Sequence, residues 1–379
     1  MNSATDYDVI IIGGGLAGLA LAIQLHQLPC RVLVIEKDAY PRHKVCGEYV
    51  SMESKPFLER LGLPLDGMAL PRIAQLEVTD IKGHTLHTSL SPGGFGISRY
   101  KLDAALAGIA MDAGIPVLTK TKADHVLFIN DHFRVQTQQE QYTAKVVCGA
   151  WGKRSNIDIR SERDFVLAQK KSLNNYMGIK YHIEYPWPSS LIALHNFRDG
   201  YCGISNIEEG KSCLCYLTRA GNLQQSGNDI KRMEHDILMQ NPHLKKIFTE
   251  ATFLWQQPLA ISQISFQQKE QVWDHVLLLG DAAGLITPLC GNGMSMAFHA
   301  SKLAFLAIQD FLSHRISRDA LESRYTTAWK KQFGTRLAAG RLLQANFGQN
   351  QVTSLLLRTL KTFSFLQKPL IRATSGRPF

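Results

Sequence analysis

Three glycines near the start of the chain have the spacing of a turn that binds a dinucleotide. Gly13, Gly15 and Gly18 form the pattern GxGxxG. Gly13 permits a tight turn, Gly15 lets a diphosphate approach the backbone, and Gly18 lets a helix pack closely on a strand. Glu36 follows 18 residues after Gly18, where its carboxylate can accept hydrogen bonds from a ribose diol. These four residues predict dinucleotide binding.

The elements around the glycines are the ones that this chemistry needs. Apolar runs at Val9–Ile12 and Val32–Ile35 predict two buried strands, and a helix is expected to start near Ala17. The N-terminus of such a helix directs free N–H groups and a positive dipole at the phosphates. The first 36 residues therefore predict a strand, a glycine turn, a helix and a second strand that ends on an acid.

A second motif near the other end of the chain favours FAD over NAD. Val276–Leu279 predicts a buried strand, which ends at Gly280 and Asp281. Its acid can hold another hydroxyl of a long cofactor. The Gly291-Asn292-Gly293 turn then opens an apolar helix from about Met294 to Leu312, whose N-terminus can stabilise negative charge on a reduced flavin. The alternative is an ordinary strand-to-helix turn.

Three further segments carry a family resemblance. They are Pro41–Glu48 (PRHKVCGE), Ser98–Asp103 (SRYKLD) and Cys148–Ser155 (CGAWGKRS). With the two glycine motifs, they make the chain resemble the flavoprotein superfamily of aromatic hydroxylases, flavin-dependent halogenases and geranylgeranyl reductases. The resemblance implies an α/β fold: a Rossmann-like FAD-binding domain of the glutathione-reductase type, with an inserted antiparallel β-sheet substrate domain and C-terminal helices. Because the two separated glycine motifs can each hold one part of a long dinucleotide, we also predict tightly bound, non-covalent FAD.

The resemblance extends the set of expected site residues. The cofactor-binding residues that it adds are Lys37, Arg42, Cys46, Arg99, Pro288 and Met294. Of these, Cys46 and Pro288 are also the candidates for the catalytic pocket, although Cys46 can equally be a buried structural thiol. Lys44 and Glu48 share the Cys46 loop, where they either line the pocket or form a surface ion pair. His182, His195 and His299 are candidate bases.

One position departs from the family pattern. Trp151 stands where the family has the Asp of a Gly-Ala-Asp-Gly motif, which is associated with the pyrophosphate and with pyridine-nucleotide handling. FAD binding can rest on the other contacts. NAD(P)H stays a possible electron donor, but we expect direct reduction by it to be inefficient.

The pattern between the FAD motifs predicts a sheet domain in two pieces. Strand-like runs occur at Tyr176–Tyr185, Leu191–Phe197, Tyr201–Ile207 and Cys213–Thr218. A helix is expected at about Asp229–Met239, followed by a strand near Phe253–Ile264. We assign residues 1–69, 98–165 and 272–340 to the FAD-binding domain, residues 70–97 and 166–271 to the substrate domain, and residues 341–379 to a basic helical segment.

Composition is consistent with a large folded enzyme. The chain has 379 residues and is 45% hydrophobic, enough for a substantial core. It has no apolar run long enough for a membrane span and no charged leader before the first strand. Its seven scattered cysteines lack the spacing of a zinc site, so we expect no metal. We expect a reduced, cytoplasmic protein.

The C-terminal segment carries the excess positive charge. The last acid is Glu322, and ten Lys and Arg residues follow it. Apolar residues alternate with these cations at helical spacing. The alternatives are a solvated helical face, docking to an acidic partner such as an acyl carrier protein, and docking to an anionic membrane surface. We expect no nucleic-acid partner, because no recognition module accompanies the cations.

Three functions stay open. The first is a monooxygenase that hydroxylates an aromatic or polyketide-like substrate through a flavin C4a-hydroperoxide. The second is an ene-reductase of the geranylgeranyl reductase type. The third is a flavin-dependent halogenase or an electron-relay flavoprotein. In each case the expected partner is a small-molecule substrate, either free, carrier-tethered or lipid-like.

Overall fold

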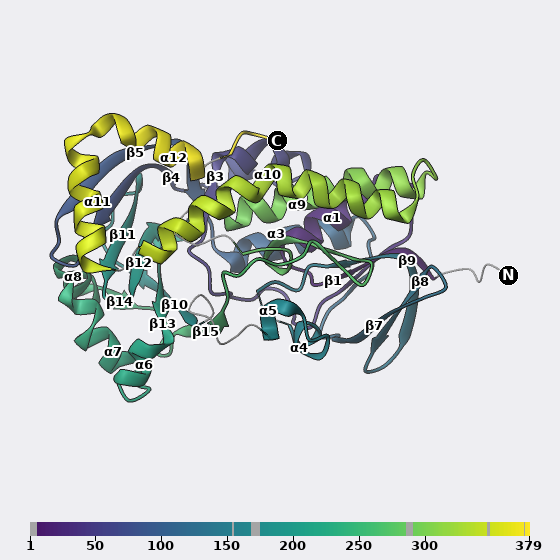
Figure 1. The fold of residues 1–379 in the computed structure, drawn as a ribbon, viewed down its shortest axis with the longest axis horizontal. Coiled ribbons are helices and arrows are strands. Elements are labelled where there is room, and N and C mark those ends of the chain that lie inside the picture. Colours follow the sequence, from purple (N-terminus) through teal and green to yellow (C-terminus); the bar gives the residue numbers. More distant parts are fainter. Residues whose placement is uncertain (1–5, 154, 168–174, 286–290, 347–348, 375) are drawn as a thin grey trace.

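The protein is built around two β-sheets that lie side by side (Figure 1). The computed structural model describes residues 6–153, 155–167, 175–285, 291–346, 349–374 and 376–379. The predicted α/β fold is confirmed, with parallel and antiparallel pairs in both sheets.

The first sheet is the predicted Rossmann-like layer. In spatial order its strands are β16 (Val272–Trp273), β17 (Val276–Leu278), β9 (Gln141–Gly149), β1 (Tyr7–Ile12), β2 (Val32–Ile35) and β6 (Val117–Leu118), while the hairpin of β7 (Ala123–Ile129) and β8 (His132–Thr137) extends from β9. From β17 to β6 the neighbours are parallel. A parallel sheet is buried on both faces, which explains the unbroken apolar runs of β1 and β2.

Helices cover this sheet and fix the position of the glycine turn. They include α1 (Leu16–Leu25), α3 (Arg99–Asp112), α9 (Gly293–Leu312) and α10 (Arg318–Asn346). Every residue of α1 is buried, because the helix lies between the sheet and α9. The Gln24 amide of α1 donates to the Ser301 hydroxyl of α9 at 3.2 Å. The predicted helix at Met294–Leu312 corresponds to α9.

The second sheet forms the other half of the molecule. In spatial order its strands are β14 (Thr252–Phe253), β10 (Tyr176–Glu184), β13 (Ser212–Arg219), β12 (Gly200–Asn206), β11 (Leu191–Phe197), β4 (Arg72–Thr79), β5 (Thr85–Gly96) and β3 (Tyr49–Ser51), with β15 (Leu259–Ile264) also paired to β10. All of its pairs are antiparallel except β11 with β4. The single strand predicted near Phe253–Ile264 was wrong. Pro258, which has no N–H to donate, lies between the two strands found there.

Shorter helices surround the sheets. They are α2 (Lys55–Arg60), α4 (Asn156–Arg160), α5 (Asp164–Leu167), α6 (Ala220–Gln225), α7 (Ile230–Asp236), α8 (Pro242–Glu250), α11 (Asn350–Thr362) and α12 (Gln367–Thr374), with 3-10 turns at η1 (Met52–Ser54), η2 (Leu65–Met68), η3 (Glu208–Gly210), η4 (Leu238–Gln240), η5 (Gly280–Ala282) and η7 (Ser364–Leu366). The helix predicted at about Asp229–Met239 is α7 and η4, with Asp229 as its N-cap. Helices α11 and α12 lie along the outer edge of the second sheet (Figure 1).

The sheets also show how the chain passes between the two halves. Strand β3 lies within residues 1–69, which we assigned to the FAD-binding domain, yet it pairs with β5 of the second sheet. The connection that carries Lys44, Cys46 and Glu48 therefore runs from the first sheet to the second. Among the described helices, none combines the length and apolar character that crossing a bilayer requires.

Candidate functional site

The two glycine motifs come together at one edge of the first sheet. Ile12 at the end of β1 lies beside Gly149 of β9, and Gly149 in turn lies beside Leu278 of β17. A Cβ atom on Gly280 would lie 3.5 Å from Ala17 of α1 and 3.5 Å from Ala297 of α9. Motifs about 265 residues apart in sequence thus form one site at the carboxyl ends of parallel strands, where such sheets bind ligands.

The first glycine turn has the tight packing that its sequence predicts. Gly13 has φ +109°, and a Cβ there would overlap the carbonyl oxygen of Ala150. A Cβ on Gly18 would overlap the carbonyl oxygen of Gly13. Only glycine allows this backbone conformation and this close contact between α1 and β1.

Gly15 differs because the nearest groups in front of it are the ends of two cationic side chains and not backbone atoms. The nearest atoms to a Cβ built on Gly15 are Lys44 Nζ at 3.5 Å and Arg99 Nη2 at 3.8 Å. The carboxylate of Asp103 fixes both cations: Arg99 donates to it from Nε and Nη2 at 2.7 and 2.8 Å, and Lys44 Nζ lies 3.4 Å away. A glycine cradle at a helix N-terminus with two cations in front of it fits a diphosphate.

The electrostatics of this cradle favour a bound anion. Burial, with the neighbouring charge of Arg99, lowers the pKa of Lys44 to about 8. Burial alone would raise the pKa of Asp103, but Arg99 and Lys44 outweigh that effect and hold it below its ordinary value. Two cations share one carboxylate, so a net positive charge is left for a ligand.

Glu36 stands at the end of β2, as predicted, and its carboxylate contacts the glycine turn. Its Oε2 accepts from the backbone N–H of Gly14 at 2.7 Å and lies 2.7 Å from Arg42 Nη2. Arg42 Nη1 is buried without a hydrogen-bond partner among the described residues. This orphaned donor beside Glu36 fits a ribose or a phosphate oxygen. The neighbouring Lys37 is exposed.

The second motif places a helix N-terminus at the same site. Asp281 lies in η5, where Lys269 Nζ donates to its carbonyl oxygen at 2.9 Å. Gly291 has φ +65°, and Asn292 is the N-cap of α9, which begins at Gly293. Met294 in its first turn is buried. Pro288 lies outside the described residues, so its expected role stays a prediction.

The loop after β2 connects the cradle to the second sheet through a buried ion cluster. Its last residue, Glu48, is left-handed with φ 56° and has a fully buried side chain. The carboxylate binds Lys180 Nζ, lies 2.6 Å from His182 Nε2, and accepts from the backbone N–H of Arg99 at 2.7 Å. Lys180 and His182 belong to β10. A non-glycine residue in this conformation is strained, and these contacts hold it there.

The cluster is ionised at the carboxylate. Burial would raise the pKa of Glu48, but the hydrogen bond from His182 and the charge of Lys180 lower it below its ordinary value. Burial would likewise lower the pKa of Lys180, but nearby Cys213 and Glu48 raise it. An ionised carboxylate only accepts hydrogen bonds, so His182 Nε2 carries the proton between them.

This arrangement corrects one sequence expectation. Lys44 and Glu48 do not form a surface ion pair with each other, because Lys44 turns to Asp103 and Glu48 is buried against β10. Their loop crosses from one domain to the other, so its charges meet partners on both sides. Cys46, between them, is half-buried, and its carbonyl oxygen accepts from the Cys213 thiol at 3.3 Å.

Aromatic rings form a wall beside the cluster. His43 stacks on Tyr100 with ring centroids 4.6 Å apart and lies 4.7 Å from Trp255. Trp255 also lies 4.5 Å from His182 and 5.7 Å from Lys180 Nζ. Burial and the charge of Lys180 lower the pKa of His43 to about 4, so this ring is neutral at neutral pH.

Trp151 lies at the end of β9, against Gly149. Its indole N–H donates to Asp158 Oδ1 at 3.0 Å, and Asp158 binds Arg163 Nη1 at 2.6 Å. Arg163 in turn donates to the carbonyl oxygen of Ala282 at 3.1 Å. The family acid is therefore absent at position 151, but Asp158 lies behind the indole. Through Arg163, it is connected to the loop of the second motif.

Two of the candidate bases, His195 and His299, lie away from this site. The rings of His195 and His243 stack at 5.1 Å beside Glu77, and such parallel rings do not direct both nitrogen lone pairs at one ion. The ligand atoms of Glu48, His182 and Cys213 also lie within 4.8 Å of one another, but Lys180 already neutralises the carboxylate. We therefore assign no metal to either cluster.

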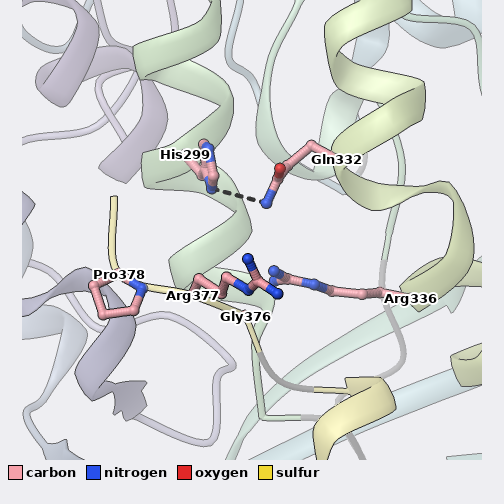
Figure 2. Close-up of a pocket in the computed structure, with 6 residues that line it drawn as sticks. All are labelled: His299, Gln332, Arg336, Gly376, Arg377 and Pro378. Carbon is pink, nitrogen blue, oxygen red and sulfur yellow. Dashed lines mark hydrogen bonds between the residues drawn. The ribbon is translucent and has the colours of Figure 1, made fainter.

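His299 lines a separate, cationic cavity of about 440 Å³. Figure 2 shows the guanidinium groups of Arg336 and Arg377 facing each other in it, with Gln332 hydrogen-bonded to His299 at 3.3 Å. Its other lining residues are Gly376 and Pro378. None of these residues belongs to the two glycine motifs, so this cavity is distinct from the cofactor cradle.

Curated relatives cover most of the chain. Conditioned medium factor receptor 1 of Dictyostelium discoideum is 25% identical over 86% of this chain and 68% of its own length. Digeranylgeranylglycerophospholipid reductase 2 of Methanothermobacter thermautotrophicus is 26% identical over 87% of this chain and 85% of its own. The 1H-pyrrole-2-carbonyl-[peptidyl-carrier protein] brominase of Pseudoalteromonas luteoviolacea is 24% identical over 78% and 76%.

The fold agrees with solved flavoproteins. The structure of a flavin-dependent brominase superposes with a TM-score of 0.79 and 17% identity, over 98% of this chain and 94% of that one. The family described as FAD binding domain matches residues 6–328. The predicted cofactor and superfamily are thereby confirmed: the chain belongs to the FAD-binding domain family and is an FAD-dependent oxidoreductase.

Proposed function

We propose that this oxidoreductase reduces a carbon–carbon double bond of a lipid-like substrate. The observation that carries the proposal is the buried Glu48–Lys180–His182 cluster next to Cys46, where the cofactor loop meets the second sheet. Alkene reduction needs a hydride on one carbon and a proton on the other. Bound FAD supplies redox equivalents as hydride, so the chain must supply the proton and the geometry.

The residues of the cradle would bind the cofactor. Gly15 and the N-terminus of α1, with Lys44 and Arg99, would hold the diphosphate. Glu36 and Arg42 would hold the adenosine end, and Asp281 would hold the sugar chain. The α9 N-terminus would stabilise negative charge at the reduced ring.

The cluster would handle the proton. Glu48 is ionised and fixes His182 with its proton on Nε2, while Lys180 neutralises the carboxylate. His182 is therefore held in one orientation beside the Trp255 ring. Because the Nε2 proton points at Glu48, we assign proton delivery to the Nδ1 position of His182, which would have to carry a second proton for this step. The thiol of Cys46, on the loop that carries Glu48, is the alternative donor. The similarity to the digeranylgeranylglycerophospholipid reductase of Methanothermobacter supports a lipid alkene as the substrate class.

A second function, hydroxylation of an aromatic substrate, is favoured by the aromatic wall. The rings of His43, Tyr100 and Trp255 could stack on a flat substrate, and the neutral His43 could accept a phenolic proton. A carrier-tethered substrate would be compatible with this alternative, as the name of the brominase relative suggests.

Two assays distinguish alkene reduction from aromatic hydroxylation. Reduced, FAD-loaded protein is incubated without oxygen with an unsaturated isoprenoid glycerolipid, and mass spectrometry follows the addition of two hydrogens. The same protein is then given oxygen and phenolic substrates in an oxygen electrode. Saturated lipid formed without oxygen supports the proposal. Oxygen uptake that depends on a phenol and inserts oxygen into it, with no lipid reduction, would replace the proposal with the second function.

A further inference from the structure

The C-terminal segment carries a high density of exposed apolar side chains. Among the described residues, six of the thirteen exposed large hydrophobic side chains fall within residues 342–366. They are Leu342, Val352, Leu355, Phe363, Phe365 and Leu366. Leu355 is 67% exposed and Phe365 is 69% exposed. We interpret this concentration as an interaction surface.

Helix α11 is anchored on one side and open on the other. Leu357 and Leu360 are buried with Val78 of β4 and Leu86 of β5. The opposite side of the helix carries Leu355 and Arg358, both exposed. Since the inner side is already packed on the second sheet, folding of the helix does not require its outer side to be covered.

The turn after α11 projects two aromatic rings. Phe363 and Phe365 are both exposed, and their ring centroids lie 6.1 Å apart at the junction with η7. Lys361 lies next to them and is exposed. Arg358 and Lys361 form no ion pair within the part of the chain that the structure describes. We call Leu355, Arg358, Lys361, Phe363, Phe365 and Leu366 the C-terminal face.

Charge identifies the partner. No acid follows Glu322 in the sequence, while ten Lys and Arg residues do. A second copy of this chain would bring like charges together. An acidic protein would satisfy the cations, but it would not require exposed aromatic rings on a projecting turn. Exposed cations next to exposed aromatic and aliphatic side chains are the combination that binds the surface of an anionic bilayer: the cations contact the headgroups and the apolar side chains enter the interface.

We propose that the C-terminal face binds the surface of anionic phospholipid membranes. Phe363, Phe365 and Leu355 enter the headgroup region, while Arg358 and Lys361 contact lipid phosphates. Because α11 packs on β4 and β5, this contact sets the second sheet against the membrane. Helices α11 and α12 cover the outer edge of that sheet (Figure 1). The proposal does not depend on which reaction the flavin site performs.

The test uses the full-length, FAD-loaded protein and vesicles of known composition. Cosedimentation is measured with phosphatidylcholine vesicles and with vesicles that also contain phosphatidylglycerol, at low and high salt. We expect binding to the anionic vesicles only, weakened by salt. Each cation near an anionic leaflet strengthens binding about fivefold, so Arg358→Glu with Lys361→Glu should weaken it at least about 25-fold. Phe363→Ser with Phe365→Ser should also abolish retention at high salt.

Matched controls come from the opposite end of the molecule. Leu127 of β7 is 53% exposed and is paired in register with the exposed Arg134 of β8. Leu127→Ser and Arg134→Glu make the same chemical changes there and should leave vesicle binding unchanged. FAD content and melting temperature, measured for every variant, show that the fold is intact.

Several outcomes would overturn the proposal. They are equal binding to neutral and anionic vesicles, unchanged binding by both C-terminal double variants, and equal loss in the control variants. Absence of vesicle binding together with salt-sensitive binding of an acidic carrier protein would assign the face to a carrier instead. Concentration-dependent dimerisation abolished by Phe363→Ser with Phe365→Ser would assign it to a second copy.

Discussion

The carboxylate of Glu48 lies 2.6 Å from Nε2 of His182, which is 134 residues further along the chain. This contact joins the loop that carries Lys44 and Cys46 to strand β10 of the second sheet. The same carboxylate binds Lys180 and the backbone of Arg99. One side chain therefore couples the cofactor cradle to the proposed substrate side.

The first prediction concerns how much the Glu48–Lys180 ion pair contributes to the free energy of unfolding. Glu48→Gln leaves the buried ammonium of Lys180 without its counter-charge, and breaking a buried pair in this way costs about 3–5 kcal/mol. Denaturant unfolding should show that loss. The pKa of Glu48 is lower in the folded protein than in the unfolded chain. Its contribution to the free energy of unfolding is therefore fully present above the ordinary carboxyl pKa. That contribution is lost as the pH falls through the pKa of Glu48 in the folded protein.

A double variant provides the control for this prediction. Lys180→Met removes the orphaned cation, so Glu48→Gln with Lys180→Met should be more stable than Glu48→Gln alone. Additive effects of the two substitutions would show that the pair is not coupled.

The second prediction separates the two roles of glycine in the first motif. Gly15→Val should leave a folded but colourless protein, because the new side chain would enter the cradle beside Lys44 and Arg99, where the diphosphate would bind. Gly18→Val should instead disrupt the fold, since its Cβ would overlap the Gly13 carbonyl. Flavin absorbance and circular dichroism measure the two effects. A yellow Gly15→Val protein would show that the cradle is not the diphosphate site.

The third prediction concerns Asp281. Asp281→Ala should weaken FAD by roughly 1–3 kcal/mol, the value of a hydrogen bond to a charged group. The loop itself should persist, because Lys269 holds the carbonyl oxygen of residue 281 and not its side chain. A fluorescence titration gives the dissociation constant, and Asp281→Asn should show a smaller loss. An unchanged affinity in the Ala variant would remove Asp281 from the cofactor site.

The local features of the cofactor half could be predicted because they repeat over short distances. Buried parallel strands are continuous apolar runs, and Gly13 and Gly18 are required by backbone geometry. The pairing of β17 with β9 was not predicted, because the two strands lie far apart in sequence. The parallel pair of β4 with β11 could not be predicted, since register between distant strands leaves no local pattern.

The ion cluster was missed because its partners are far apart in sequence. One signal was present: Lys180 interrupts the otherwise apolar centre of β10, and a buried lysine needs a counter-charge. The sequence alone could not identify Glu48 as that counter-charge. Likewise, the contact between Trp151 and Asp158 depends on the turn into α4, which places an acid seven residues away behind the indole.

The fourth prediction concerns the electron donor. Because Trp151 occupies the position of the family acid, NADPH alone should bleach the flavin slowly in the absence of oxygen. Dithionite should bleach the same sample at once, which shows that the flavin is competent. Addition of substrate or of a separate reductase should accelerate bleaching by NADPH. Fast, saturable bleaching by NADPH alone would contradict the inference drawn from Trp151.

The last prediction follows from the lowered pKa of Lys44. Without cofactor, burial holds this pKa at about 8, and the diphosphate that we place beside it would raise the value again. Binding of FAD should therefore take up protons above that pH, so affinity should fall as the pH rises from about 7 to about 9.5. Calorimetry in buffers of different ionisation enthalpy measures the proton uptake.

Lys44→Met should bind FAD more weakly and lose this pH dependence. Lys145→Met should keep the pH dependence, because Lys145 pairs with Asp8 at the opposite edge of the sheet. A pH dependence that survives in Lys44→Met would assign the titration to another group and leave Lys44 outside the diphosphate site.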